Sequence, residues 1–72
     1  MADTPMDVNQ EVLQVLLEKI EGDTYPSVTM MDMVETIIRD EDLPAYAEIL
    51  LDKIRADRFP SMDMLRRVMT LA

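Results

Sequence analysis

The side chains of this 72-residue chain that could do chemistry are carboxylates, hydroxyls and a few basic groups. The densest carboxylates are Asp40, Glu41 and Asp42, which raises calcium binding as one possible chemistry. An EF-hand loop that starts at Asp40 needs a glycine at its sixth position and a glutamate at its twelfth. The chain has Ala45 and Leu51 at those places, so this pattern does not predict a calcium site.

Catalysis has equally little support in the composition. Histidine and cysteine are absent, so the most common general base, the usual transition-metal ligands and a thiol nucleophile are all missing. The chain has one glycine and no loop that could cradle a phosphate. We therefore predict a protein that is not an enzyme and has no catalytic, cofactor-binding or metal site.

The basic residues gather in the last part of the chain. Residues 53–72 hold five basic and two acidic side chains, a net charge of +3, whereas residues 1–52 hold two basic and thirteen acidic ones, a net charge of −11. Arg58, Arg66 and Arg67 lie in a segment that can be read as a helix-turn-helix. The total charge of −8 opposes contact with phosphates, so direct DNA binding is the weaker reading.

The same charges allow three other interpretations. The arginines could meet the acidic half of a partner or of a second copy of the chain. The acidic faces could mimic DNA and inhibit a DNA-binding protein. The acidic side chains could also simply be solvated helix faces that keep the protein soluble.

Methionine is the strongest lead to a function. Six of the eight methionines lie between residues 30 and 33 or between residues 62 and 69. Met30, Met31 and Met33 cannot all point to one side of a helix, so we expect some of them to be exposed. Methionine suits surfaces that accept partner helices, although it also fills cores that lack aromatic residues. The predicted partner-binding residues are Met30, Met33, Met62, Met64, Arg58, Arg66 and Arg67.

The chain repeats a segment of its own sequence. Residues 16–27 return as residues 50–61, a displacement of 34 without a gap, with seven of twelve positions identical. Tetratricopeptide repeats share this period, but their residue pattern cannot be placed here in any register. The repeated unit reads as helix, turn, helix, over about 5–38 and again over about 39–72.

The apolar periodicity predicts four helices and no strand. The first is expected over residues 5–21, with Thr4 as its cap, Pro5 at its first position and a stop at Gly22. Its apolar face is expected to consist of Val8, Val12, Leu13, Val15, Leu16, Leu17 and Ile20. The second helix runs to about residue 39 from a cap at Ser27 or Thr29. The third begins near Pro44 and ends near Ala56, and Ser61 caps the fourth.

Each turn carries an aromatic residue before proline and serine. Tyr25 and Phe59 are expected to staple the turn by packing on the helix behind them. The alternative is that they are matched anchors on a binding edge.

Two repeat units are too few for an open solenoid, so we predict a single all-α domain, 1–72, in which two αα-hairpins close on each other as four helices. The first residues lack the features of a secretory signal, and the longest apolar runs are three residues, so a cytoplasmic location is expected. The predicted function is a protein-interaction module that docks a partner or forms a homodimer, and the alternative is a nucleic-acid-related role.

Overall fold

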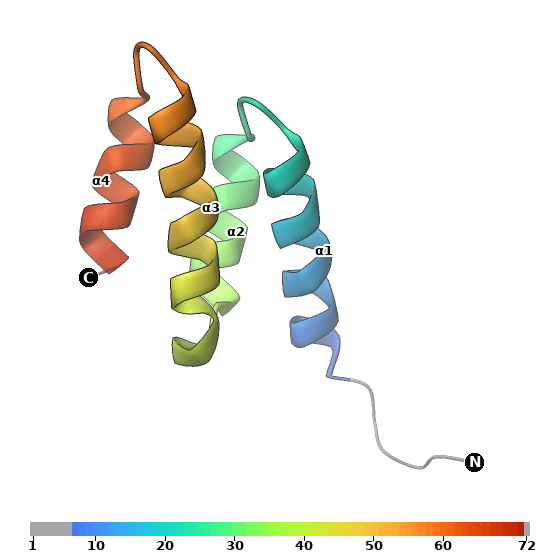
Figure 1. The fold of residues 1–72 in the computed structure, drawn as a ribbon. Coiled ribbons are helices and arrows are strands. Elements are labelled where there is room, and N and C mark those ends of the chain that lie inside the picture. Colours follow the sequence, from blue (N-terminus) through green and yellow to red (C-terminus); the bar gives the residue numbers. More distant parts are fainter. Residues whose placement is uncertain (1–6, 72) are drawn as a thin grey trace. The chain divides into compact units, whose positions relative to one another are not determined.

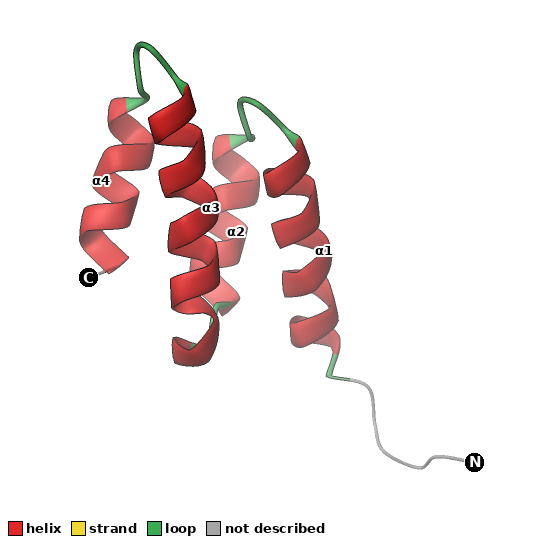
Figure 2. Cartoon of the chain, in the orientation of Figure 1, coloured by secondary structure: helices red, strands yellow, loops and turns green. Residues whose placement is uncertain are grey.

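The computed structural model describes residues 7–71, and within them it contains four α-helices and no strand (Figure 1, Figure 2). The helices are α1 (Val8–Gly22), α2 (Val28–Ile37), α3 (Leu43–Ala56) and α4 (Met62–Leu71), and a short 3₁₀ turn, η1 (Asp40–Asp42), precedes α3. The prediction of an all-α chain with two αα-hairpins is confirmed, since α1 packs on α2 and α3 packs on α4.

The chain divides into two compact units, Met1–Ile38 and Arg39–Ala72. The first contains the α1–α2 hairpin and the second contains the α3–α4 hairpin. The closure of these hairpins into one domain stays a prediction. It rests on the argument that about thirty-five residues bury too little apolar surface to fold alone.

The first helix starts later than the sequence predicted. Thr4 and Pro5 lie outside the described residues, and α1 begins at Val8 with Asp7 as its N-cap. The Asp7 carboxylate accepts a hydrogen bond from the Gln10 backbone N–H at 3.2 Å. Aspartate caps a helix at least as well as threonine does, and Asp7 lies directly before the apolar pattern. The predicted start at residue 5 is therefore three residues early.

Gly22 does not stop α1 through a left-handed backbone. It is the last residue of the helix, and no glycine in the described residues has a positive φ. The helix ends because Asp23 turns to an extended backbone while its N–H still donates to the Ile20 carbonyl. The predicted end was one residue early, and the predicted glycine mechanism is wrong.

Both second helices start with a serine cap. The Ser27 hydroxyl accepts a hydrogen bond from the Met30 N–H at 3.3 Å, and the Ser61 hydroxyl accepts one from the Met64 N–H at 3.2 Å. The Ser61 prediction is confirmed, and Ser27 rather than Thr29 is the cap of α2. This helix ends at Ile37, before the predicted residue 39, because Ile38 is already extended.

We expect the cap at Ser61 to be measurable. Replacing Ser61 by alanine leaves the Met64 N–H without its partner and should lower the free energy of unfolding by about 1 kcal/mol. Replacing it by aspartate keeps an acceptor and should cost much less. Urea denaturation followed by circular dichroism measures both changes. Equal losses in the two variants would contradict a role for the hydrogen bond.

The aromatic staples are a wrong prediction. Tyr25 is 73% exposed and Phe59 is 85% exposed, so neither packs on the helix behind it. The buried residue of the first of these turns is the proline that follows Tyr25. Pro26 precedes the Ser27 cap and is buried, as is Met31 in the next turn of α2, which is the spacing of a hydrophobic staple.

The third helix follows the prediction closely. Pro44 lies in its first turn, where a missing N–H costs nothing, and α3 ends at Ala56. Asp42 precedes it without a capping hydrogen bond from its side chain, because η1 runs directly into α3.

The cores of the two hairpins differ in size. In the first hairpin the buried apolar residues of the helices are Leu13, Leu16, Leu17, Ile20, Met31 and Val34. In the second they are Tyr46, Leu50 and Met64. The broad apolar face predicted for α1 therefore splits, because Val8, Val12 and Val15 are exposed.

Candidate interaction surfaces

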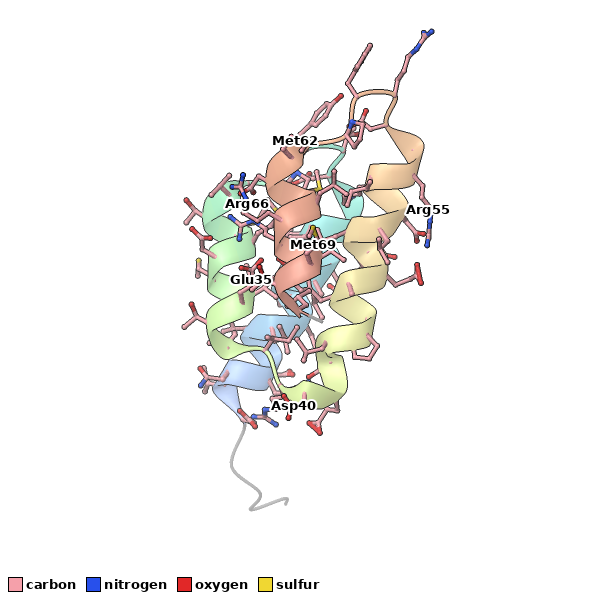
Figure 3. All side chains as sticks on the ribbon, turned by 90° about the vertical axis from the view of Figure 1, so that its left-hand side faces the viewer. Glu35, Asp40, Arg55, Met62, Arg66 and Met69 are labelled. Carbon is pink, nitrogen blue, oxygen red and sulfur yellow. The ribbon has the colours of Figure 1, made fainter. Side chains whose placement is uncertain are left out.

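One face of α4 exposes two methionines and an arginine. Met62, Arg66 and Met69 recur at steps of four and three residues, so they line one side of the helix. Met62 is 69% exposed and Met69 is 76% exposed, and Arg66 is exposed between them. Figure 3 shows the three side chains along the same helix. We call these three residues the α4 stripe.

The rest of α4 explains why the stripe faces outward. Met64 lies on the opposite side of the helix and is buried. Leu65, Val68 and Leu71 are half-buried around it. Since Met64 fixes the inward direction, the side chains at positions 62, 66 and 69 have to point away from the core of this hairpin. The turn before α4 adds exposed Arg58 and Phe59 at the same end as Met62.

The two adjacent arginines of α4 have different roles. The Arg67 Nε donates to the Asp63 carboxylate at 2.7 Å, one turn away, and its side chain is only 10% exposed. Such a pair holds the guanidinium along the helix and away from solvent. Arg66 is turned outward and is exposed. Of the two, Arg66 alone is placed to contact another molecule.

The predicted contact residues therefore separate into groups. Met62, Arg58 and Arg66 lie together on α4 and its preceding turn, and all three are exposed. Met33 is exposed on α2 of the first hairpin, and Met30 is half-buried there. Met64 is in the core and Arg67 is held by Asp63, so neither lies at a surface that is open to a partner. The expectation that some of the methionines are exposed is confirmed.

A second apolar surface lies on α1, and the sequence interpretation missed it. Val8, Val12 and Val15 are exposed and follow the same four-then-three spacing as the α4 stripe. We call them the α1 stripe. Glu11 is three residues after Val8 and four before Val15, so its exposed carboxylate lies beside both. The sequence does contain a signal for this surface. Around the helix axis, the three valines lie about a third of a turn away from the buried set, Leu13, Leu16, Leu17 and Ile20.

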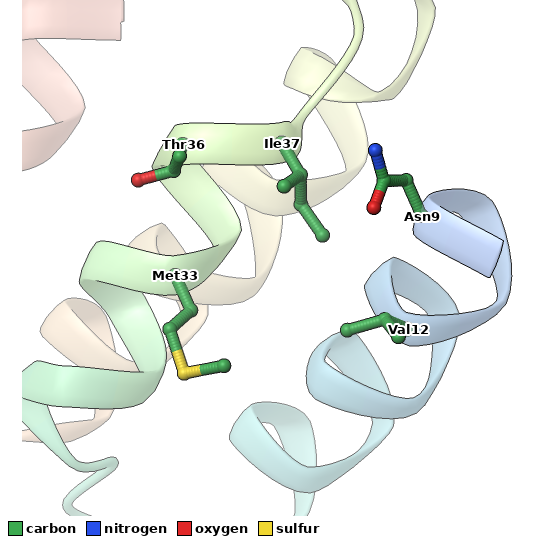
Figure 4. Close-up of a pocket in the computed structure, with 5 residues that line it drawn as sticks. All are labelled: Asn9, Val12, Met33, Thr36 and Ile37. Atoms are coloured by element: carbon green, nitrogen blue, oxygen red, sulfur yellow. The ribbon is translucent and has the colours of Figure 1, made fainter.

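The α1 stripe borders a groove within the first hairpin. The groove has a volume of about 320 Å³ and is lined by Asn9 and Val12 from α1 and by Met33, Thr36 and Ile37 from α2. In Figure 4 the side chains of Val12 and Met33 extend into the space between the two helices. The Thr36 hydroxyl donates to the Asp32 carbonyl at 2.9 Å, so it is already satisfied by its own helix. The groove offers a mostly apolar contact.

Metal-binding clusters and membrane-spanning helices are not found in the described part of the chain. Within residues 7–71, no three acidic side chains come together in a way that could hold a metal ion. None of the helices in that range has the length and apolar character needed to cross a membrane.

Comparison of the chain with protein-family models, with curated proteins and with solved structures finds no match.

Proposed function

We propose that this chain is a protein-interaction module without enzymatic activity, and that the α4 stripe is its main contact surface. The observation that carries the proposal is the exposure of Met62 and Met69 on the side of α4 opposite the buried Met64. Two flexible, polarizable side chains flank one cation, which suits the apolar face of a partner helix that also carries a carboxylate.

The neighbouring residues extend this surface. Phe59 is the most exposed large apolar residue of the described chain, and it lies in the turn at the Met62 end of α4. Arg58 beside it is also exposed. Aromatic, methionine and arginine side chains are the types enriched where proteins meet, so the composition of this surface agrees with binding. The contact expected here is an apolar one with cationic side chains at its centre and edge.

The experiment is capture of partners from the source lysate on immobilised protein, with a variant that removes the surface. In M62S/M69S the helix is retained but the apolar side chains are lost. The matched control is V28S, because Val28 occupies the repeat position of Met62 in the first hairpin and is also exposed. We expect a partner that binds the wild type and V28S but binds M62S/M69S at least tenfold more weakly. Equal recovery on all three proteins would contradict the proposal.

The competing prediction is a role with nucleic acid. A mobility shift with duplex DNA that weakens with salt and is lost in R66E would favour direct contact through α4. Competition with DNA for a nuclease or regulator would favour acidic mimicry. Circular dichroism of every variant, to verify its helix content, keeps loss of fold apart from loss of binding.

A further inference from the structure

We infer that the partner of the α4 stripe is the α1 stripe of a second copy of this chain. The inference rests on the proposed function, because it names the occupant of the same surface. Three properties of the two stripes carry it: their spacing, their charge and their presence on one chain.

The spacing of the two stripes is the same. Met62 to Met69 and Val8 to Val15 each span seven residues, or about 10 Å along a helix at about 1.5 Å per residue. Each stripe has a residue at the intermediate position, Arg66 in one and Val12 in the other. When the helices lie side by side, both methionines meet a valine at the same time. In a parallel arrangement the aliphatic stem of Arg66 then covers Val12.

The charges are complementary at the same position. Glu11 lies beside Val8 and Val15, so a cation that covers Val12 comes within reach of its carboxylate. The two hairpins as a whole also differ in charge. Residues 1–38 hold one basic and eight acidic side chains, whereas residues 39–72 hold six basic and seven acidic ones. The first hairpin therefore attracts the cationic face of α4, and the contact should weaken as salt is added.

The charges are compatible with either direction of the two helices. In a parallel arrangement Met62 meets Val8, and Arg66 lies over Val12 beside Glu11. In an antiparallel arrangement Met62 meets Val15, and Arg66 lies opposite Glu11 itself. The contact between Arg66 and Glu11 is present in both arrangements, so charge reversal at these two positions tests it whichever direction the helices take.

Each copy carries both stripes, so a pair of copies offers this contact twice. Sedimentation equilibrium of the wild type over a series of concentrations measures the dissociation constant of the dimer.

The test uses charge reversal in two different chains. In R66E the α4 stripe gains a carboxylate that faces Glu11 of the other copy, and in E11R the α1 stripe gains a cation that faces Arg66. Each variant alone should dimerise at least tenfold more weakly than the wild type. In an equimolar mixture both contacts are again between opposite charges. We therefore expect a heterodimer at least as tight as the wild-type dimer.

The control pair separates this contact from the effect of net charge. R55E and E41R change the charge of the chain by the same amounts at exposed positions outside both stripes. Arg55 does contact Glu48 and Asp52, at 3.0 and 3.2 Å, but these exposed pairs contribute little to stability. These variants should dimerise as the wild type does, within about threefold. If their mixture shows the same gain as R66E with E11R, net charge explains the result and the inference is overturned.

The remaining outcomes distinguish the inference from the proposed function. If the wild type stays monomeric up to about 1 mM, which corresponds to a binding free energy weaker than about 4 kcal/mol, the second copy is not the partner. The proposed function then stands if M62S/M69S still loses capture of another protein, and it falls with the inference if capture is unchanged. If E11R dimerises normally while R66E does not, the occupant of the α4 stripe is a different acidic surface and the assignment to α1 is wrong.

Discussion

Replacing Tyr46 by alanine is expected to remove a large part of the stability of this protein. Tyr46 is the largest of the fully buried side chains, at 0% exposure. The helices of its hairpin bury only two other residues, Leu50 and Met64. Truncating a buried aromatic ring costs about 3–5 kcal/mol. A chain of this length is typically stable by about 4–11 kcal/mol. In thermal denaturation followed by circular dichroism, we expect a fall in Tm of more than about 10 °C.

The repeat supplies a matched control for this prediction. Val12 occupies the position of Tyr46 in the first hairpin, but it is 38% exposed. Val12→Ala should cost less than about 1 kcal/mol, because little apolar surface leaves a packed site. Tyr46→Phe keeps the ring and removes the hydroxyl, which separates the two contributions. A loss in Val12→Ala as large as that in Tyr46→Ala would show that burial does not control stability at this position.

These two residues also show what the sequence could predict and what it could not. The 34-residue repeat predicted the hairpins because both copies use the same apolar period and the same serine caps. Helix period alone places Val12 and Tyr46 at equivalent positions, and it does not say that one is exposed and the other buried. That difference depends on which neighbours cover each helix, and neighbours far along the chain leave no local signal.

The candidate surface could be predicted in part for the same reason. The outward direction of Met62 and Arg66 follows from helix geometry once Met64 is known to be buried. Neighbouring positions give no way to choose between Met62 and Met64 beforehand, because either could face the core. The aromatic residues show a related limit. Tyr25 and Phe59 both lie close to a capped helix in the sequence. In the turn between α1 and α2, however, the buried residue is Pro26, which directly precedes the Ser27 cap.

Some of the differences between the two copies fall on the exposed surfaces. Arg66 stands at the repeat position of Asp32, and Met62 at that of Val28. The copies agree at four of five positions in the Leu16–Ile20 and Leu50–Ile54 segments, which lie near the helix ends and carry part of the core. The duplicated segment therefore specifies the hairpin, and the second copy alone carries a cation at the centre of its exposed face.

The second large effect is expected at the matched leucines of the repeat. Leu50 is fully buried in α3, and Leu16, its counterpart in α1, is 8% exposed. Truncating either to alanine should lower the free energy of unfolding by about 2–5 kcal/mol, with the larger loss for Leu50 because its site is more enclosed. Urea denaturation measures both losses, and Leu51→Ala, at a half-buried position of the same helix, is the control with a smaller expected effect.

The same two variants test whether the hairpins form one domain. If the hairpins fold as a single cooperative unit, Leu50→Ala weakens the protection of the slowest-exchanging amides in α1 and α2 as much as in α3 and α4, because all of them exchange through the same global unfolding. Leu16→Ala should then have the same uniform effect. If each hairpin unfolds independently, every variant changes exchange only in its own hairpin. Native-state hydrogen exchange measured by NMR separates these outcomes, and a loss confined to one hairpin would contradict the single-domain prediction. We expect the uniform loss, because neither core is large enough to hold a hairpin of this length alone.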